Sequence, residues 1–116
     1  MRKMKLSLAL FLMSVAPGYA NDLTATRERM EVCIFNAVER YASKTCEDAA
    51  VIGDAALNSC SEAIRSFEKA SFADKRFSHI PYDQFKRLIG ETISEYKGPI
   101  FQRVLDTRIN VGRDCP

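Results

Sequence analysis

The spacing of apolar residues predicts a long helical hairpin over residues 24–70. In both halves of this stretch apolar side chains recur every three or four positions, which places them on one face of a helix. The chain is expected to reverse at residues 43–46, where the Thr45 hydroxyl is positioned to cap the second helix. The apolar positions are Leu23, Met30, Cys33, Ile34, Ala37, Val38, Tyr41 and Ala42 in the first arm, and Ala49, Ile52, Ala56, Cys60, Ala63, Ile64 and Phe67 in the second.

A third helical segment is predicted to begin at Pro81, because proline suits the first turn of a helix, where its missing N–H costs nothing. Gly98 and Pro99 predict a kink in this segment, and Gly112 predicts its end. The face expected to pack inward consists of Phe85, Leu88, Ile89, Thr92, Ile93 and Tyr96 before the kink, and Ile100, Phe101, Val104, Leu105 and Arg108 after it.

Four cysteines in an exported chain predict two disulfides. Cys33 and Cys46 are 13 positions apart and Cys46 and Cys60 are 14 apart, which is about 20 Å along a helix in each case. Both separations exceed the roughly 7 Å that a disulfide allows between Cα atoms. Only one connectivity avoids both short pairs, so we expect Cys33–Cys60 and Cys46–Cys115.

This pairing favours an all-α, up-down-up bundle whose third arm is kinked at Gly98-Pro99. Cys46 lies at the turn end of the hairpin, whereas the second arm carries the chain to the open end. If the third arm is only kinked, residues 81–110 span about 45 Å and return Cys115 to the turn end. A tight reversal would instead leave Cys115 at the open end. A four-helix bundle is therefore the alternative, with other cysteine pairs or a tail that loops back.

Residues 1–20 have the pattern of a secretory signal peptide, which leaves residues 21–116 as a single helical domain. Basic residues precede an apolar stretch over residues 6–16 that is too short to span a bilayer, and small residues flank Tyr19 at the expected cleavage site. We expect a periplasmic or secreted protein whose mature N-terminus is Asn21. The alternative is an N-terminal anchor that is not cleaved.

Cleavage also changes the charge of the chain. The whole sequence has 17 basic and 15 acidic residues. Removing Arg2, Lys3 and Lys5 with the leader leaves 14 basic residues against 15 acidic ones. A domain so close to neutral has no electrostatic basis for binding nucleic acid, and no membrane contact is expected after cleavage.

No catalytic, cofactor or metal-binding motif is recognisable. The cysteines are too far apart for a zinc site, and His79 is the only histidine. Glu91 and Glu95 lie one turn apart, a spacing that paired catalytic carboxylates would use, although glutamates on a solvated helix face are far commoner. Nucleotide-binding loops, Ser-His-Asp sets and haem-attachment motifs are absent from the sequence. We therefore expect no enzymatic activity, no metal and no cofactor.

Aromatic and cationic residues mark a candidate partner-binding surface. Phe72 and Phe77 flank a basic pair that includes Arg76, in the connection formed by residues 71–80. Phe35 lies off the main apolar stripe of the first arm. Aromatic and arginine side chains supply most hot spots in protein interfaces, so these four residues are the candidates. The alternative is that the phenylalanines close the open end of the core.

The run Cys33-Ile34-Phe35-Asn36-Ala37 resembles the cysteine-bearing first helix of helical periplasmic immunity proteins that neutralise type VI secretion amidases. The resemblance covers these five residues and implies a protein-binding, inhibitory role. Small size and cross-linking also favour an exported interaction protein, such as an inhibitor, an immunity factor or a chaperone-like module, with another protein as its partner. A small-ligand carrier that binds between the helices is the alternative, although the many alanines and Gly53 predict closely packed arms.

Overall fold

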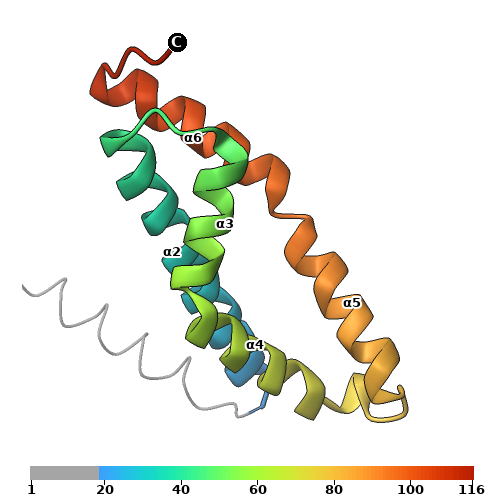
Figure 1. The fold of residues 1–116 in the computed structure, drawn as a ribbon. Helices are drawn as coiled ribbons and strands as arrows, with labels where there is room; N and C mark the ends of the chain where they lie inside the picture. The colour runs from blue at the N-terminus through green and yellow to red at the C-terminus, as the bar shows by residue number, and fades with distance from the viewer. Residues whose placement is uncertain (1–18) are drawn as a thin grey trace, which may run out of the picture.

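The computed structural model describes residues 19–116, and all regular structure in that range is helical. The chain makes three passes, up, down and up (Figure 1). The expected all-α, disulfide-linked architecture is therefore confirmed. The first pass is α2 (Tyr19–Lys44), the second is α3 (Ala49–Ser59) and α4 (Ser61–Ala73), and the third is α5 (Tyr82–Ser94) and α6 (Lys97–Val111), preceded by the 3-10 turn η1 (Lys75–Phe77).

Helix α2 is the centre of the core, because α3, α4 and α6 all pack against it. Five residues of its predicted inward face are fully buried, whereas Leu23, Cys33 and Tyr41 are half-buried. The buried apolar side chains are Met30, Ile34, Ala37, Val38 and Ala42 from α2, Ile52, Ala56, Cys60 and Phe67 from the second pass, and Phe85, Ile89, Ile100 and Val104 from the third.

Three residues assigned to the inward face by the sequence pattern are exposed instead. They are Leu88 on α5 and Phe101 and Leu105 on α6. Apolar residues at helical spacing show which side chains share a face, but not whether another element covers that face. In this bundle α6 already buries Ile100 and Val104 against its neighbours. The stripe containing Phe101 and Leu105 lies beside that buried face.

The second pass is two helices rather than the one helix expected. Cys60 separates α3 from α4 with φ −108° and ψ 23°, which are not helical angles. The Ser59 hydroxyl donates to the Ala56 carbonyl at 3.0 Å, and the Cys60 amide shares that same acceptor. Side-chain bonds of this kind compete with the helical ladder and bend helices. The bend leaves Cys60 buried.

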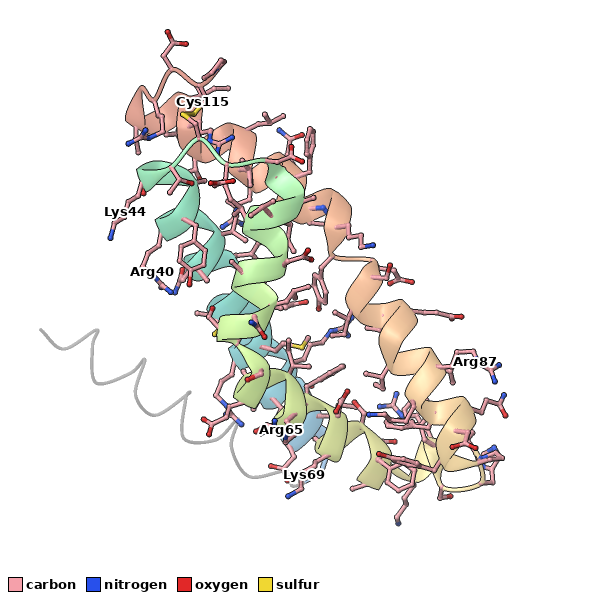
Figure 2. All side chains as sticks on the ribbon, in the orientation of Figure 1. Arg40, Lys44, Arg65, Lys69, Arg87 and Cys115 are labelled. Carbon is pink, nitrogen blue, oxygen red and sulfur yellow. A yellow bond between two sulfur atoms is a disulfide. The ribbon has the colours of Figure 1, made fainter. Side chains whose placement is uncertain are left out.

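Both disulfides join the cysteines expected from the helical spacing. Cys33–Cys60 connects α2 to the bend in the second pass, with 5.9 Å between the Cα atoms. Cys46–Cys115 connects the linker between α2 and α3 to the C-terminal segment, with 5.4 Å between the Cα atoms. Figure 2 shows this second bond, at Cys115, close to the linker between α2 and α3. Stable disulfides form in oxidising compartments, so the two bonds indicate an oxidising environment for this protein.

The capping expected of Thr45 is wrong. Helix α3 begins at Ala49, and its N-cap residue, Asp48, makes no side-chain capping bond. The Thr45 hydroxyl instead donates to the Tyr41 carbonyl at 3.1 Å and accepts from the Glu47 amide at 3.4 Å. The Thr45 hydroxyl thus forms hydrogen bonds at the end of α2 and within the linker, and it does not cap the start of α3.

Two arginines of the last segment form hydrogen bonds with carbonyls at the end of α2 and in the linker that follows it. Arg108 donates to the carbonyl of Thr45 at 3.0 Å and to that of Glu47 at 2.7 Å. Arg113 donates to the Ser43 carbonyl at 2.8 Å. Carbonyls at a helix C-terminus lack intrahelical partners, and cations there also oppose the helix dipole favourably. The same contacts fix the orientation of α6 against α2.

The third pass is interrupted three residues before the expected kink. Helix α5 ends at Ser94, and Gly98 and Pro99 lie inside the first turn of α6. Pro99 has no N–H to donate four residues back, and its ring would clash with the carbonyl of Glu95 in a continuous helix. The break therefore falls at Glu95 and Tyr96, and proline occupies the first turn that tolerates it.

Gly53 permits a close approach, but of α6 rather than of the first arm. A Cβ added at this glycine would lie 3.3 Å from a methyl carbon of Ile100. That distance is tighter than ordinary van der Waals contact, so the missing side chain allows α3 and α6 to pack closely. The expectation that Gly53 brings the two hairpin arms together is corrected accordingly.

The predicted signal peptide lies almost entirely outside the described residues, so cleavage before Asn21 remains a prediction. Within residues 19–116, none of the helices is both long enough and apolar enough to cross a membrane. Every buried side-chain nitrogen or oxygen in that range has a hydrogen-bond partner.

Candidate functional site

An aromatic cluster joins the end of α4 and η1 to the start of α5. Phe85 lies at its centre and is only 2% exposed. The ring of Phe72 lies 4.9 Å from that of Phe85 and 5.3 Å from that of Tyr82, and the ring of Phe77 lies 5.9 Å from that of Phe85. The cluster thus brings together two of the predicted partner-binding residues, Phe72 and Phe77. Phe77 packs against the core, whereas Phe72 remains 44% exposed.

A basic cleft of about 490 Å³ opens on the Phe72 side of this cluster. Arg65 and Lys69 project from α4 beside it (Figure 2), and Lys86 of α5 completes the group. The Lys86 ammonium lies 5.9 Å from the centre of the Tyr82 ring, within reach of a cation–π interaction. Glu68 also lines the cleft, so the exposed aromatic surface lies among three basic side chains and one acidic one.

The predicted binding residue Arg76 is exposed but already paired. Its guanidinium donates to both carboxylate oxygens of Asp74, at 2.9 and 3.1 Å, and its backbone amide donates to the same carboxylate at 2.9 Å. These hydrogen bonds lower the pKa of Asp74 to about 2 and raise the pKa of Arg76 above its usual range. The pair caps η1, so the guanidinium has a local structural role in this loop.

The fourth predicted residue, Phe35, lies on a different part of the bundle. It is half-buried on α2, and its ring meets that of Tyr96 edge-on at 6.1 Å. The Arg103 guanidinium lies 4.8 Å from the centre of the Phe35 ring and is 2.7 Å from Glu39. Phe35 therefore joins α2 to the junction of α5 and α6. The structure does not bring all four predicted residues into one surface.

A groove of about 860 Å³ runs between α2, α4 and α5 and includes Arg76 and Phe77. At one end Phe85 anchors α5 in the aromatic cluster. At the other end the Tyr96 hydroxyl donates to the Glu31 carboxylate at 2.6 Å. The lining residues are Leu23, Thr24, Arg27, Glu28, Glu31, Phe67, Ser71, Arg76, Phe77, Phe85, Leu88, Ile89, Glu91, Thr92 and Glu95.

The hydrogen bond between Tyr96 and Glu31 is a specific link between the first and third passes. Partial burial raises the pKa of the Tyr96 hydroxyl, and the neighbouring Glu31 carboxylate raises it further, which outweighs the opposite effect of Arg27. A raised pKa means that the neutral hydroxyl is favoured in the folded state. Its stabilising contribution is therefore fully present below about pH 10 and is lost as the pH rises through the folded-state pKa.

Replacing Tyr96 by phenylalanine is expected to lower the free energy of unfolding by about 1–2 kcal/mol at pH 7, because hydrogen bonds to charged groups are stronger than neutral ones. Urea denaturation at neutral pH measures this loss. Tyr82→Phe is the matched control, since the exposed Tyr82 hydroxyl makes no hydrogen bond to other residues in the 19–116 range. Equal losses for the two variants would contradict the assignment.

A ridge of exposed apolar side chains on α6 is the surface that the sequence pattern missed. Phe101, Leu105 and Ile109 follow one another at intervals of four residues, and they are 53%, 41% and 75% exposed. Side chains four positions apart lie on one helix face, so they form a continuous strip, here called the α6 ridge. A shallow pocket of about 360 Å³ between α3 and α6 continues from Phe101 to Leu57.

The described residues hold no group of three histidine, cysteine, aspartate or glutamate side chains that could bind a metal ion. His79 is exposed in the loop before α5. Glu91 on α5 and Glu95 directly after it are both exposed and line the groove. Their position suits charge recognition by a partner.

The chain matches no protein-family model, no curated protein and no solved structure. Its function must therefore be inferred from its own surfaces. Two of them are candidates for recognising a partner: the α6 ridge and the groove between α2, α4 and α5.

Proposed function

We propose that this protein is a small exported interaction module, secreted or periplasmic, that binds another protein through the α6 ridge. The observation that carries the proposal is the exposure of Phe101, Leu105 and Ile109 in one strip. Contiguous apolar surface of this kind is unfavourable in water and is typical of protein interaction sites. The disulfides and the signal-peptide pattern of residues 1–20 support export.

The rigidity of the ridge supports the same conclusion. Arg108 lies within the ridge segment and donates to carbonyls at the end of α2 and in the linker. The Cys46–Cys115 bond lies four residues beyond the last residue of the helix, Val111. A helix held at this end loses little freedom when it binds, so more of its contact energy is available as affinity.

The alternative, a small-ligand carrier, would require an enclosed apolar cavity. The groove between α2, α4 and α5 is instead an open surface feature with a charged rim, which includes Glu91, Glu95 and Arg76. Enclosed sites bury most of a small ligand and present only a few polar groups. The surfaces described here are better suited to a protein.

The double variant Phe101→Gln/Ile109→Gln tests the proposal. Tagged protein, produced in its native cells and cross-linked there, is expected to retain its partner, whereas the double variant should retain at least about tenfold less, because a hot-spot residue contributes about 2 kcal/mol or more. The bound proteins are identified and quantified by mass spectrometry. The melting temperature should change little, since both side chains are more than half exposed.

Val32→Gln/Val51→Gln is the matched control, because both valines are exposed apolar residues on other helices. This variant is expected to capture the partner as the unaltered protein does. Equal capture by the ridge variant and the control would remove the ridge from the proposal. Recovery of lipid vesicles or a small molecule in place of a protein would count against the proposed function itself.

A further inference from the structure

The groove between α2, α4 and α5 offers a second surface, which shares no residue with the α6 ridge. We propose that it binds a basic amphipathic helix of a partner protein. This goes beyond the proposed function, because it assigns a different site with a defined partner chemistry and can fail independently. The inference rests on the charge of the rim, the apolar floor and the helical walls.

The rim of the groove carries carboxylates without opposite charges. Both arginines in the lining are already engaged, since Arg27 lies 3.8 Å from Glu31 and Arg76 is paired with Asp74. The remaining acidic residues, Glu28 on one wall and Glu91 and Glu95 on the other, form no ion pair with any of the residues described. A ligand that enters the groove thus meets uncompensated negative charge from both sides.

The floor of the groove is apolar. Phe67, Phe77, Phe85 and Ile89 line it, and Leu88 is exposed above them. A ligand that offers only positive charge would leave this surface in contact with water. The best fit is a segment with one apolar face and lysine or arginine at its margins, because it covers the floor and meets the carboxylates together.

The walls favour a helix as the ligand. All regular structure in residues 19–116 is helical, so the groove has no free strand edge to which an extended peptide could add. Recognition must use side chains, as when an amphipathic helix lies in a groove. The lining residues Phe85 and Glu95, on α5 and directly after it, are ten positions apart, or about 15 Å along a helix, which matches roughly three turns of a bound helix.

The basic residues of α4 and α5 lie outside the groove. Arg65, Lys69 and Lys86 gather at the basic cleft, and Arg87 points outward from α5 (Figure 2). None of these four residues lines the groove. A basic segment would be repelled from the cleft and attracted to the groove, so the two sides of the aromatic cluster differ in the sign of their charge.

The test uses a fluorescently labelled peptide of about three helical turns, built from leucine and lysine with leucine on one face. Its affinity is measured by fluorescence anisotropy against the full chain with both disulfides formed. The Glu91→Gln/Glu95→Gln variant is expected to bind about tenfold more weakly, since it removes two charge pairs. Leu88→Gln should also weaken binding, because it makes the floor polar.

Glu47→Gln/Glu62→Gln is the matched control, because it removes the same number of exposed charges away from the groove. This control is expected to bind within about twofold of the unaltered protein. Thermal melts are expected to show that all of these variants remain folded. Equal losses for the two glutamate pairs would overturn the site. Equal binding of a scrambled peptide or of a glutamate-for-lysine peptide would overturn the partner chemistry, and no measurable binding would overturn the proposal.

Discussion

Replacing Cys46 and Cys115 together by alanine is expected to lower the free energy of unfolding by about 4 kcal/mol. This disulfide encloses 69 residues, and the loop-closure relation assigns about 4.4 kcal/mol to a loop of that length. The corresponding value for Cys33–Cys60, which encloses 27 residues, is about 3.5 kcal/mol. The Cys46–Cys115 bond should therefore be the more important of the two cross-links.

The expected loss arises mainly in the unfolded chain. In the folded state Arg108 and Arg113 still donate to the carbonyls of residues 43–47. Without the cross-link these contacts keep the C-terminal segment in place, so the native structure should survive. The unfolded chain, by contrast, gains all the conformations that the closed loop had excluded.

Urea denaturation distinguishes this mechanism from damage to the native state. The midpoint should fall, and the slope of free energy against urea should rise, because an unfolded chain without the cross-link exposes more surface. The melting temperature should fall by roughly 15–30 °C. A loss below about 1 kcal/mol with an unchanged slope would contradict the loop-closure argument.

The sequence was sufficient to predict features that depend on spacing. The helical period located the inward face of α2, and the rise per residue excluded the short cysteine pairs. The selected pairs Cys33–Cys60 and Cys46–Cys115 then determined the direction of the third pass. Each of these inferences uses distances along one helix, which do not depend on the packing of distant segments.

Features that depend on contacts between helices could not be predicted in this way. The exposure of Phe101 and Leu105 follows from which side of α6 the other helices cover. The break at Cys60 involves a hydroxyl bond from Ser59 that competes with the helix. The groove exists because α5 is held at its two ends, by Phe85 and by Tyr96, and neither contact has a local signature in the sequence.

The second large effect is expected for Phe85→Ala. Only Phe85 and Ile89 of α5 are buried, so this one ring accounts for much of the packing that holds the helix. Truncating a buried phenylalanine typically costs about 3–5 kcal/mol, from lost transfer energy and the remaining cavity. Phe72 and Phe77 would also lose their shared aromatic neighbour.

The Phe85→Ala change should destabilise α5 more than it destabilises the rest of the protein. Helices α2, α3 and α4 are joined by the Cys33–Cys60 disulfide and by the direct packing of α3 and α4 against α2, whereas α5 adds to the same core only through Phe85 and Ile89. Hydrogen exchange of the Phe85→Ala variant should therefore show residues 82–94 opening at lower free energy than α2, as expected when one unit loses its anchor. Phe72→Ala is the control, because the more exposed ring should cost less. Uniform loss of protection along the chain would instead mean that α5 and α2 unfold as one cooperative unit.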